Sequence, residues 1–276
     1  MKFLQTQGVS MPKLGLGTFR MTDDQCRAAV EHALQIGYRH IDTAEMYGNE
    51  APIGQAIAAA GLDRKSLFVT TKVWHEHLAP DQIRSAFKAS LDRLRLDFVD
   101  LYLIHWPSPV MDLPGALETL MHLREQGFAR AIGVSNFNLP LIKAAVEDVR
   151  APIACNQVEY HVFLDQTPML DYLRRKGIPL IAYAPLAKGA TAQNDALNRI
   201  GKKYGISGAQ VALAWLLGQD GVGAIPKAQS PASQAANLKA AEIVLDDDDR
   251  RVIASLPKNL RNVKPAFAPD WDAPLR

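Results

Sequence analysis

The stretch Gly37-Tyr-Arg-His-Ile-Asp-Thr-Ala-Glu-Met-Tyr-Gly-Asn-Glu50 places a carboxylate at the end of a short apolar run and a phenol soon after it. The carboxylate is Asp42 and the phenol is Tyr47. Two later apolar runs also end in a titratable residue, Lys72 and His105. Short apolar runs bounded by polar residues are typical of buried strands. The sequence therefore places proton-transferring side chains at or just after the ends of successive strands.

The same alternation of apolar runs and helical patterns continues along the whole chain. The expected strands are Lys13–Gly17, Tyr38–Asp42, Leu67–Lys72, Val99–His105, Ala131–Ser135, Ala154–Glu159, Pro179–Ala184 and Gly223–Pro226. Segments between them carry apolar residues at helical spacing. No linker or low-complexity stretch interrupts the order. Strands that alternate with helices in this way predict an α/β fold, a closed (β/α)8 TIM barrel that spans residues 1–276 as a single domain.

Two additions to the simple barrel are expected. Residues Phe3 to Ser10 predict an N-terminal β-hairpin that closes the barrel bottom, and a segment from about Ser207 to Leu217 predicts an extra helix before the last strand. Glycines that follow helical patterns are interpreted as C-terminal stops, because glycine adopts the left-handed conformation that ends many helices. These glycines are Gly37, Gly61, Gly127 and Gly177.

Composition excludes several classes of protein. Of 276 residues, 48% are hydrophobic and 22% are charged, and the net charge is +2, so neither nucleic acid nor a membrane surface is an expected partner. No segment is long and apolar enough to span a bilayer, and the first residues lack the apolar core of a signal peptide. Two cysteines, Cys26 and Cys155, do not make a disulfide framework. We expect a cytoplasmic monomer.

The four titratable residues suit proton transfer if one barrel mouth gathers them. A free tyrosine has a pKa of about 10 and donates its proton poorly, so a cation such as Lys72 is expected to lower the pKa of Tyr47. A buried lysine needs a counter-charge, which Asp42 can supply. His105 can orient a carbonyl oxygen by hydrogen bonding. This set predicts general acid catalysis at a carbonyl that is being reduced.

Each of these residues has an ordinary structural interpretation when taken alone. An acid or a lysine at a strand end is commonly one half of a structural ion pair, and a tyrosine or histidine there commonly packs at the edge of the core. These interpretations weaken because the parallel strands of a barrel bring such ends to one mouth. A metal-dependent barrel lyase or isomerase stays open as an alternative, although no His, Cys and Asp cluster has the spacing of metal ligands.

Motifs along nearly the whole chain resemble those of the aldo-keto reductase family. The matching stretches, in chain order, are Gly37–Glu50, Thr71-Lys-Val-Trp74, Ile104-His-Trp-Pro107, Gly133-Val-Ser-Asn-Phe137, Asn156-Gln-Val-Glu159 and Ile225-Pro-Lys227. The short loops and the Gly17-Thr-Phe-Arg20 start are most similar to the bacterial 2,5-diketo-D-gluconate and methylglyoxal reductase branch.

The resemblance implies a role for each matching residue. Tyr47 would donate the proton, Lys72 and Asp42 would adjust the pKa of Tyr47, and His105 would orient the carbonyl. An NADPH cofactor is implied, with its nicotinamide stacked on Tyr183 and hydrogen-bonded by amide and hydroxyl side chains. The implied cofactor residues are Thr18, Asp42, Ser135, Asn136, Gln157, Tyr183, Leu186, Lys227 and Asn237.

The residues expected to bind the adenine end of the cofactor depart from the family pattern. Lys227 matches the residue that meets the 2′-phosphate of NADPH, but Ser233 stands where the family often has arginine. A guanidinium grips a phosphate with two parallel hydrogen bonds, and serine cannot. We therefore expect NADPH as the cofactor, with some use of NADH.

The substrate side of the mouth is expected to be aromatic. Phe19, Trp74 and Trp106 follow expected strands and would bind substrate together with His105. The loop Ser108–Leu113 is short, and the tail Val263–Trp271 could cover one side. A shallow pocket favours small aldehydes and ketones such as methylglyoxal and 2,5-diketo-D-gluconate. The alternative is a regulatory or structural protein of the same fold that binds the cofactor without turnover.

Overall fold

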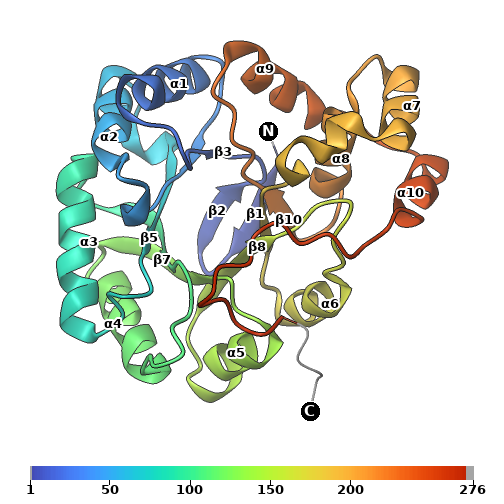
Figure 1. The fold of residues 1–276 in the computed structure, drawn as a ribbon. Helices are drawn as coiled ribbons and strands as arrows, with labels where there is room; N and C mark the ends of the chain where they lie inside the picture. Colours follow the sequence, from blue (N-terminus) through green and yellow to red (C-terminus); the bar gives the residue numbers. More distant parts are fainter. Residues whose placement is uncertain (1, 272–276) are drawn as a thin grey trace.

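The computed structural model describes residues 2–271, in which eight parallel strands form one curled sheet. Each strand hydrogen-bonds to the next strand along the chain, and the helices lie around the outside (Figure 1). The strands are β3 (Leu16–Gly17), β4 (His40–Asp42), β5 (Phe68–Val73), β6 (Val99–Ile104), β7 (Ala129–Ser135), β8 (Ile153–Glu159), β9 (Leu180–Tyr183) and β10 (Val222–Ala224).

Hydrogen bonds between the first and last strands close the sheet into a barrel. The amide of Gly15 donates to the carbonyl of Ala224 at 2.9 Å, and the amide of Gly17 donates to the carbonyl of Pro226 at 3.2 Å. A side chain at position 17 would place its Cβ 2.5 Å from the carbonyl oxygen of Ile225, so glycine lets the two edges approach. The predicted (β/α)8 barrel is confirmed.

Local signals set the helix ends. The helices are α1 (Asp23–Gln35), α2 (Glu50–Ala59), α3 (Pro80–Leu94), α4 (Leu113–Glu125), α5 (Leu139–Lys143), α6 (Thr167–Lys176), α7 (Asp195–Tyr204), α8 (Gly208–Leu217), α9 (Pro231–Ala240) and α10 (Asp247–Ala254). A capping box between Ser207 and Gln210 starts α8, because each residue satisfies a backbone amide of the other. Gly177 ends α6 with a φ of +66°, as its sequence position predicts.

Short helical turns fill several connections. They are η1 (Glu45–Tyr47), η2 (Arg64–Ser66), the π-helical η3 (Ala144–Asp148) and η4 (Ala187–Gln193). Of these, η1 follows β4 and carries Tyr47, so it matters most for the site.

The predicted extra helix is present as α8, but a further helix, α7, precedes it. Helix α8 packs against β10 and α9, and most of its residues are buried. Helix α7 instead packs on α8 and α10 and buries a narrow face that includes Leu197 and Ile200. A helix that is apolar on most sides fits inside a packed layer, whereas one with a single apolar stripe fits on its outside. The addition outside the barrel layer is therefore α7.

An N-terminal hairpin closes one end of the barrel. Strands β1 (Phe3–Thr6) and β2 (Val9–Pro12) pair antiparallel, so the hairpin is two residues longer than predicted. Leu4 and Met11 belong to the same apolar cluster as Phe68 and Ala154, at the starts of barrel strands. The Thr6 hydroxyl donates to the carbonyl of Ala154 at 2.9 Å. With this end filled, the open mouth lies at the carboxyl ends of the strands.

None of the helices within residues 2–271 is both long and apolar enough to cross a bilayer.

Candidate active site

The structure brings the four predicted titratable residues together at the barrel mouth. The ammonium of Lys72 donates to Asp42 Oδ1 at 2.5 Å and lies 5.1 Å from the ring centre of Tyr47. Tyr47 Oη is 3.5 Å from Nε2 of His105, whose ring stands nearly perpendicular to the phenol. Residues from β4, η1, β5 and the end of β6 therefore meet in one cluster, because parallel strands direct these ends to the same edge.

The Asp42–Lys72 ion pair is fully enclosed, and both partners make further hydrogen bonds. The side chains are 1% and 0% exposed. Asp42 Oδ2 accepts a hydrogen bond from Gln157 Nε2 at 2.8 Å, and Lys72 also donates to the carbonyl of Thr43 at 2.8 Å. Buried charges are tolerated when a partner and further hydrogen bonds replace water. Gln157 lies on β8, so this network connects distant sides of the barrel.

A hydrogen-bonded loop positions Tyr47. The turn η1 ends at Gly48, which has a φ of +68°. The following Asn49 is buried and donates to the carbonyl of Thr18 at 2.9 Å, while its own oxygen accepts from the Thr43 hydroxyl at 2.7 Å. These bonds tie the loop to the ends of β3 and β4. The phenol is consequently held at the mouth although it is not part of a strand.

The expected lowering of the Tyr47 pKa is not found. Burial raises the pKa of Tyr47 well above its usual value, and the carboxylate of Asp42 raises it further. Lys72 does not offset this, because its charge is hydrogen-bonded to Asp42. The phenol therefore keeps its proton at neutral pH, so it can act as an acid but not as a base.

His105 is a neutral imidazole. Burial lowers its pKa well below 6.5, and the nearby Lys72 and His75 lower it further. Its Nδ1 is buried and has no hydrogen-bond partner among the described residues. Its carbonyl accepts from the amide of Asn136 at 2.9 Å, which links it to β7. A neutral ring carries one donor and one acceptor nitrogen, so Nε2 can hydrogen-bond an oxygen beside Tyr47.

Polar side chains of β7, β8 and β9 line the adjoining part of the mouth. Ser135 donates to the carbonyl of Gln157 at 2.7 Å, and the Tyr183 hydroxyl donates to Asn136 Oδ1 at 2.7 Å. Asn136 has a φ of +62°, a conformation that costs energy for a non-glycine residue and is common at functional sites. Tyr183 is partly exposed at the end of β9. The predicted nicotinamide residues thus lie together beside the tetrad.

The remaining predicted cofactor residues are spread around the rim. Thr18 is buried and donates to the carbonyl of Asp42 at 2.9 Å, and Leu186 follows β9 and is half-buried. Lys227 is exposed after β10, whereas Asn237 is buried on α9.

Sequence reasoning missed Arg20 at this rim. Lys227 Nζ donates to the carbonyl of Arg20 at 3.4 Å, across the closure between β3 and β10. Arg20 has a φ of +60° and is exposed. The only sequence signal was a cation placed directly after Phe19. Ser233, in the first turn of α9, is also exposed and bonds the Ser230 hydroxyl at 2.8 Å.

Aromatic side chains wall the other side of the mouth, as predicted. The ring centres of Trp74 and His105 are 5.2 Å apart, and those of Phe19 and Tyr47 are 5.0 Å apart. The ring centres of Trp106 and Trp271, which belongs to the tail, are 6.4 Å apart. The tail adds Phe267, whose ring lies 5.6 Å from both Trp74 and Trp106. Phe267 had not been singled out from the sequence, although its segment had.

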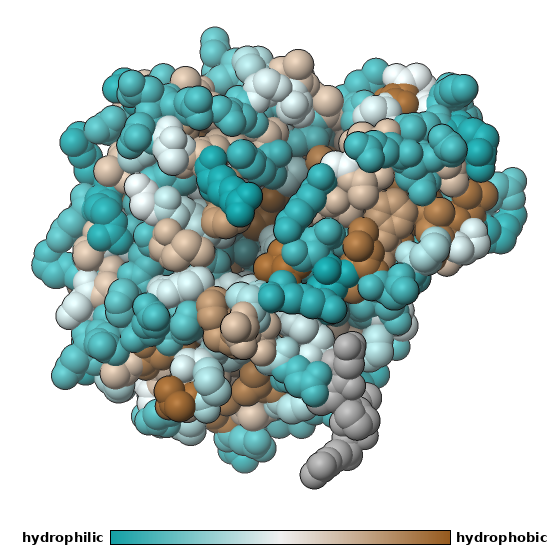
Figure 2. Space-filling view, viewed as in Figure 1, coloured by the Kyte–Doolittle hydropathy of each residue, from teal (hydrophilic) through white to brown (hydrophobic). Residues whose placement is uncertain are grey.

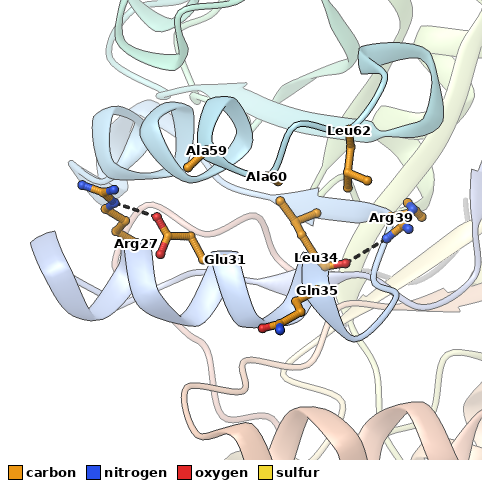
Figure 3. Close-up of a pocket in the computed structure, with 8 residues that line it drawn as sticks. All are labelled: Arg27, Glu31, Leu34, Gln35, Arg39, Ala59, Ala60 and Leu62. Atoms are coloured by element: carbon orange, nitrogen blue, oxygen red, sulfur yellow. Dashed lines mark hydrogen bonds and ion pairs between the residues drawn. The ribbon is translucent and has the colours of Figure 1, made fainter.

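The mouth and a separate surface pocket are distinct. Figure 2 shows the face around the barrel axis hollowed near its centre, with both hydrophilic and hydrophobic side chains around the hollow. An open pocket of about 580 Å³ lies elsewhere, on the outside between α1 and α2 (Figure 3). It is lined by Arg27, Glu31, Leu34, Gln35, Arg39, Ala59, Ala60 and Leu62. None of these residues belongs to the tetrad, so that pocket is not the candidate site.

Within the part of the chain that the structure describes, no group of three or more His, Cys, Asp or Glu side chains could hold a metal ion.

Replacing Lys72 by methionine keeps the length of the side chain and removes its charge. Asp42 then becomes an uncompensated buried carboxylate, so we expect the free energy of unfolding to fall by about 3–5 kcal/mol. Urea unfolding measures this change. The control is Lys88→Met, which breaks an exposed pair with Asp92 and should cost at most about 0.5 kcal/mol. Equal losses for the two variants would contradict the buried pair.

The neutral state of His105 makes stability depend on pH. An unfolded histidine has a pKa of about 6.5, and the folded pKa is lower, so the unfolded chain binds the proton more readily. The contribution of His105 to the free energy of unfolding is therefore fully present above about pH 6.5. It falls as the pH drops below that value, by up to about 1.4 kcal/mol per pH unit. Urea unfolding between pH 5 and 8 should show a shallower slope for His105→Gln. Identical slopes would mean that His105 does not contribute.

Known proteins resemble the chain over nearly its whole length. The model of the Aldo/keto reductase family matches residues 13–257. Methylglyoxal reductase DkgB of Salmonella typhi is 41% identical over 96% of this chain and 100% of its own length. A solved structure named as a 2,5-diketo-D-gluconic acid reductase B has a TM-score of 0.96 and 38% identity, and covers 99% of this chain and 98% of its own. The aldose reductase of Schistosoma japonicum has a TM-score of 0.90 and 30% identity, over 97% and 95% of the two chains. Together with the mouth geometry, these matches show that the chain belongs to the aldo/keto reductase family of carbonyl-reducing, NAD(P)H-using oxidoreductases.

Proposed function

We propose that this protein reduces small aldehydes and ketones to alcohols with NADPH, and that Tyr47 donates the proton. The observation that carries the proposal is the convergence of Tyr47 Oη and His105 Nε2, 3.5 Å apart, above the buried Lys72–Asp42 pair. A carbonyl oxygen placed between these two groups would receive hydrogen bonds from both. Such donors stabilise the negative charge that develops on oxygen during reduction.

The protonation states support these roles. Tyr47 keeps its proton because burial raises its pKa, and His105 is neutral because burial lowers its pKa. Burial makes Tyr47 a weaker acid than a free tyrosine, so it gives its proton only to an oxygen that hydride transfer has made strongly basic, while His105 orients the oxygen without adding a charge. The tyrosinate that remains would lie near the Lys72 ammonium, which is 5.1 Å from the ring centre of Tyr47 and hydrogen-bonded to Asp42.

The residues beside the tetrad fit a nicotinamide group. Gln157 uses its amide nitrogen on Asp42, which leaves its amide oxygen for the NH₂ of a carboxamide. Ser135 and Asn136 supply further polar atoms, and the partly exposed ring of Tyr183 offers a flat surface for stacking. When bound, the nicotinamide supplies a hydride to the carbonyl carbon. The chain's own side chains bind, orient and protonate the substrate.

The expected substrates are small and polar. The relatives are named for methylglyoxal and for 2,5-diketo-D-gluconic acid, and we propose these two compounds as substrates. The aromatic rings of Trp74, Trp106 and Phe267 line the mouth on the side of His105. NADPH oxidation with each compound tests the proposal. Cofactor binding without any turnover would favour the regulatory or structural alternative.

Replacing Tyr47 by phenylalanine removes the donated proton and keeps the ring. Because general acid catalysis contributes a factor of about 10²–10⁴, we expect kcat to fall by at least that much while the Kd for NADPH stays nearly constant. Tyr172→Phe is the matched control, since that hydroxyl bonds Glu147 on the outer helices. Near-normal turnover of Tyr47→Phe would remove Tyr47 as the proton donor.

The choice between NADPH and NADH should depend on Lys227. Lys227→Ala should raise the Kd for NADPH and leave the Kd for NADH nearly unchanged. Ser233→Arg should tighten NADPH binding selectively by about 1–2 kcal/mol, because hydrogen bonds to charged groups are the stronger ones. Fluorescence titration with both cofactors measures this, and Lys239→Ala, in the last turn of α9, serves as the control. If Lys227→Ala weakens both cofactors equally, the lysine does not recognise the 2′-phosphate.

A further inference from the structure

A buried carboxylate binds the backbone of the C-terminal tail. Glu159 is the last residue of β8 and is 0% exposed. Its Oε1 accepts from the amide of Asn262 at 2.7 Å, and its Oε2 accepts from the amide of Val263 at 2.9 Å. These bonds join residues about a hundred positions apart in the sequence. The tail is therefore attached to the barrel at a strand end beside the mouth.

His161 completes the surroundings of the carboxylate. Its ring is buried, and its Nε2 lies 3.0 Å from Glu159 Oε1. The amide of Phe163 donates to Nδ1 at 3.3 Å, and Nε2 also lies 3.2 Å from Nδ2 of Asn262. Burial alone would raise the pKa of Glu159, but the bonds from His161, Asn262 and Val263 together lower it. Glu159 is therefore charged at neutral pH, and tail amides supply much of its hydrogen bonding.

The anchored segment leads directly to the aromatic wall. Phe267 lies a few residues beyond Val263, and its ring packs 4.0 Å from that of His75. It also meets Trp74 and Trp106, each at 5.6 Å. Trp74 in turn contacts His105. A continuous set of contacts thus runs from the Glu159 carboxylate, along the tail, to the group that faces the carbonyl.

We propose that Glu159 is a positioning residue whose carboxylate fixes the tail and thereby places Phe267 as the specificity-determining wall of the substrate site. This inference rests on the proposed carbonyl reduction. Without the anchor, the tail would lose two charge-assisted hydrogen bonds, which are the stronger kind. Phe267 would then pack less firmly on Trp74 and Trp106. Substrates with an aromatic ring that packs on Phe267 would bind more weakly, while the tetrad would keep its geometry.

The variant Glu159→Gln tests the anchor, since it keeps the size of the side chain and replaces one acceptor oxygen by a donor. Hydrogen exchange at the amides of Asn262 and Val263 should become at least tenfold faster, because their common partner is weakened. The KM for p-nitrobenzaldehyde, an aromatic probe, should rise about tenfold. The KM for methylglyoxal and the Kd for NADPH should change by less than about twofold.

Two further variants separate the anchor from general loss of structure. Phe267→Ala should raise the KM for p-nitrobenzaldehyde without changing the exchange of the two amides. Combined with Glu159→Gln, it should add little to the KM, because both changes act on one wall. Asp100→Asn is the matched control, a buried carboxylate that pairs with Arg64 and Arg130 at the start of β6. It should lower stability and leave both readouts unchanged.

Specific outcomes would overturn the inference. Unchanged amide exchange in Glu159→Gln would show that the carboxylate does not hold the tail. Equal rises in both KM values and in the Kd for NADPH would show a collapse of the whole mouth instead of a positioned wall. If Glu159→Gln does not fold, Glu159→Asp, which retains the charge but withdraws the oxygens, is measured in the same way. If the wild type reduces no carbonyl, the proposed function fails, whereas the exchange of the amides still tests the anchor.

Discussion

The buried ion pair between Lys72 and Asp42 is the interaction on which the rest of the mouth depends. Neither charge touches water, so each needs its partner and additional hydrogen bonds. Those bonds come from Thr43 beyond β4 and from Gln157 on β8, on another side of the barrel. The pair can persist only if the closed barrel holds these strands in place. The same closure sets the position of Tyr47 and His105 above it.

Burial, more than the neighbouring cation, decides the protonation of this site. Tyr47 keeps its proton and His105 stays a neutral ring with a single N–H, and in both cases loss of water is the largest cause. Water exclusion disfavours whichever form is charged, so it makes an acid weaker and a base weaker at once. The result is a neutral proton donor beside a neutral hydrogen-bonding ring. This combination suits an oxygen that becomes negative only during the reaction.

The two ends of the barrel are built differently. The hairpin β1–β2 fills the end where the strands begin, and its apolar side chains join the barrel core. The other end receives only loops and the tail, which is anchored by the carboxylate of Glu159. A filled end adds stability, whereas a loop-lined end leaves room for a ligand and for side chains with chemical roles.

The sequence by itself determined the class of fold and the members of the tetrad. Apolar periodicity predicted the strands, and parallel strands necessarily carry Asp42, Lys72 and His105 to one mouth. It did not predict helix α7, because a short amphipathic segment in a connection can pack in several places. Only the tertiary structure decided the direction of the Tyr47 pKa, since burial depends on every neighbouring element. It alone joined Gln157 to Asp42 and brought Phe267 to Trp74, because contacts between residues distant in sequence follow from packing.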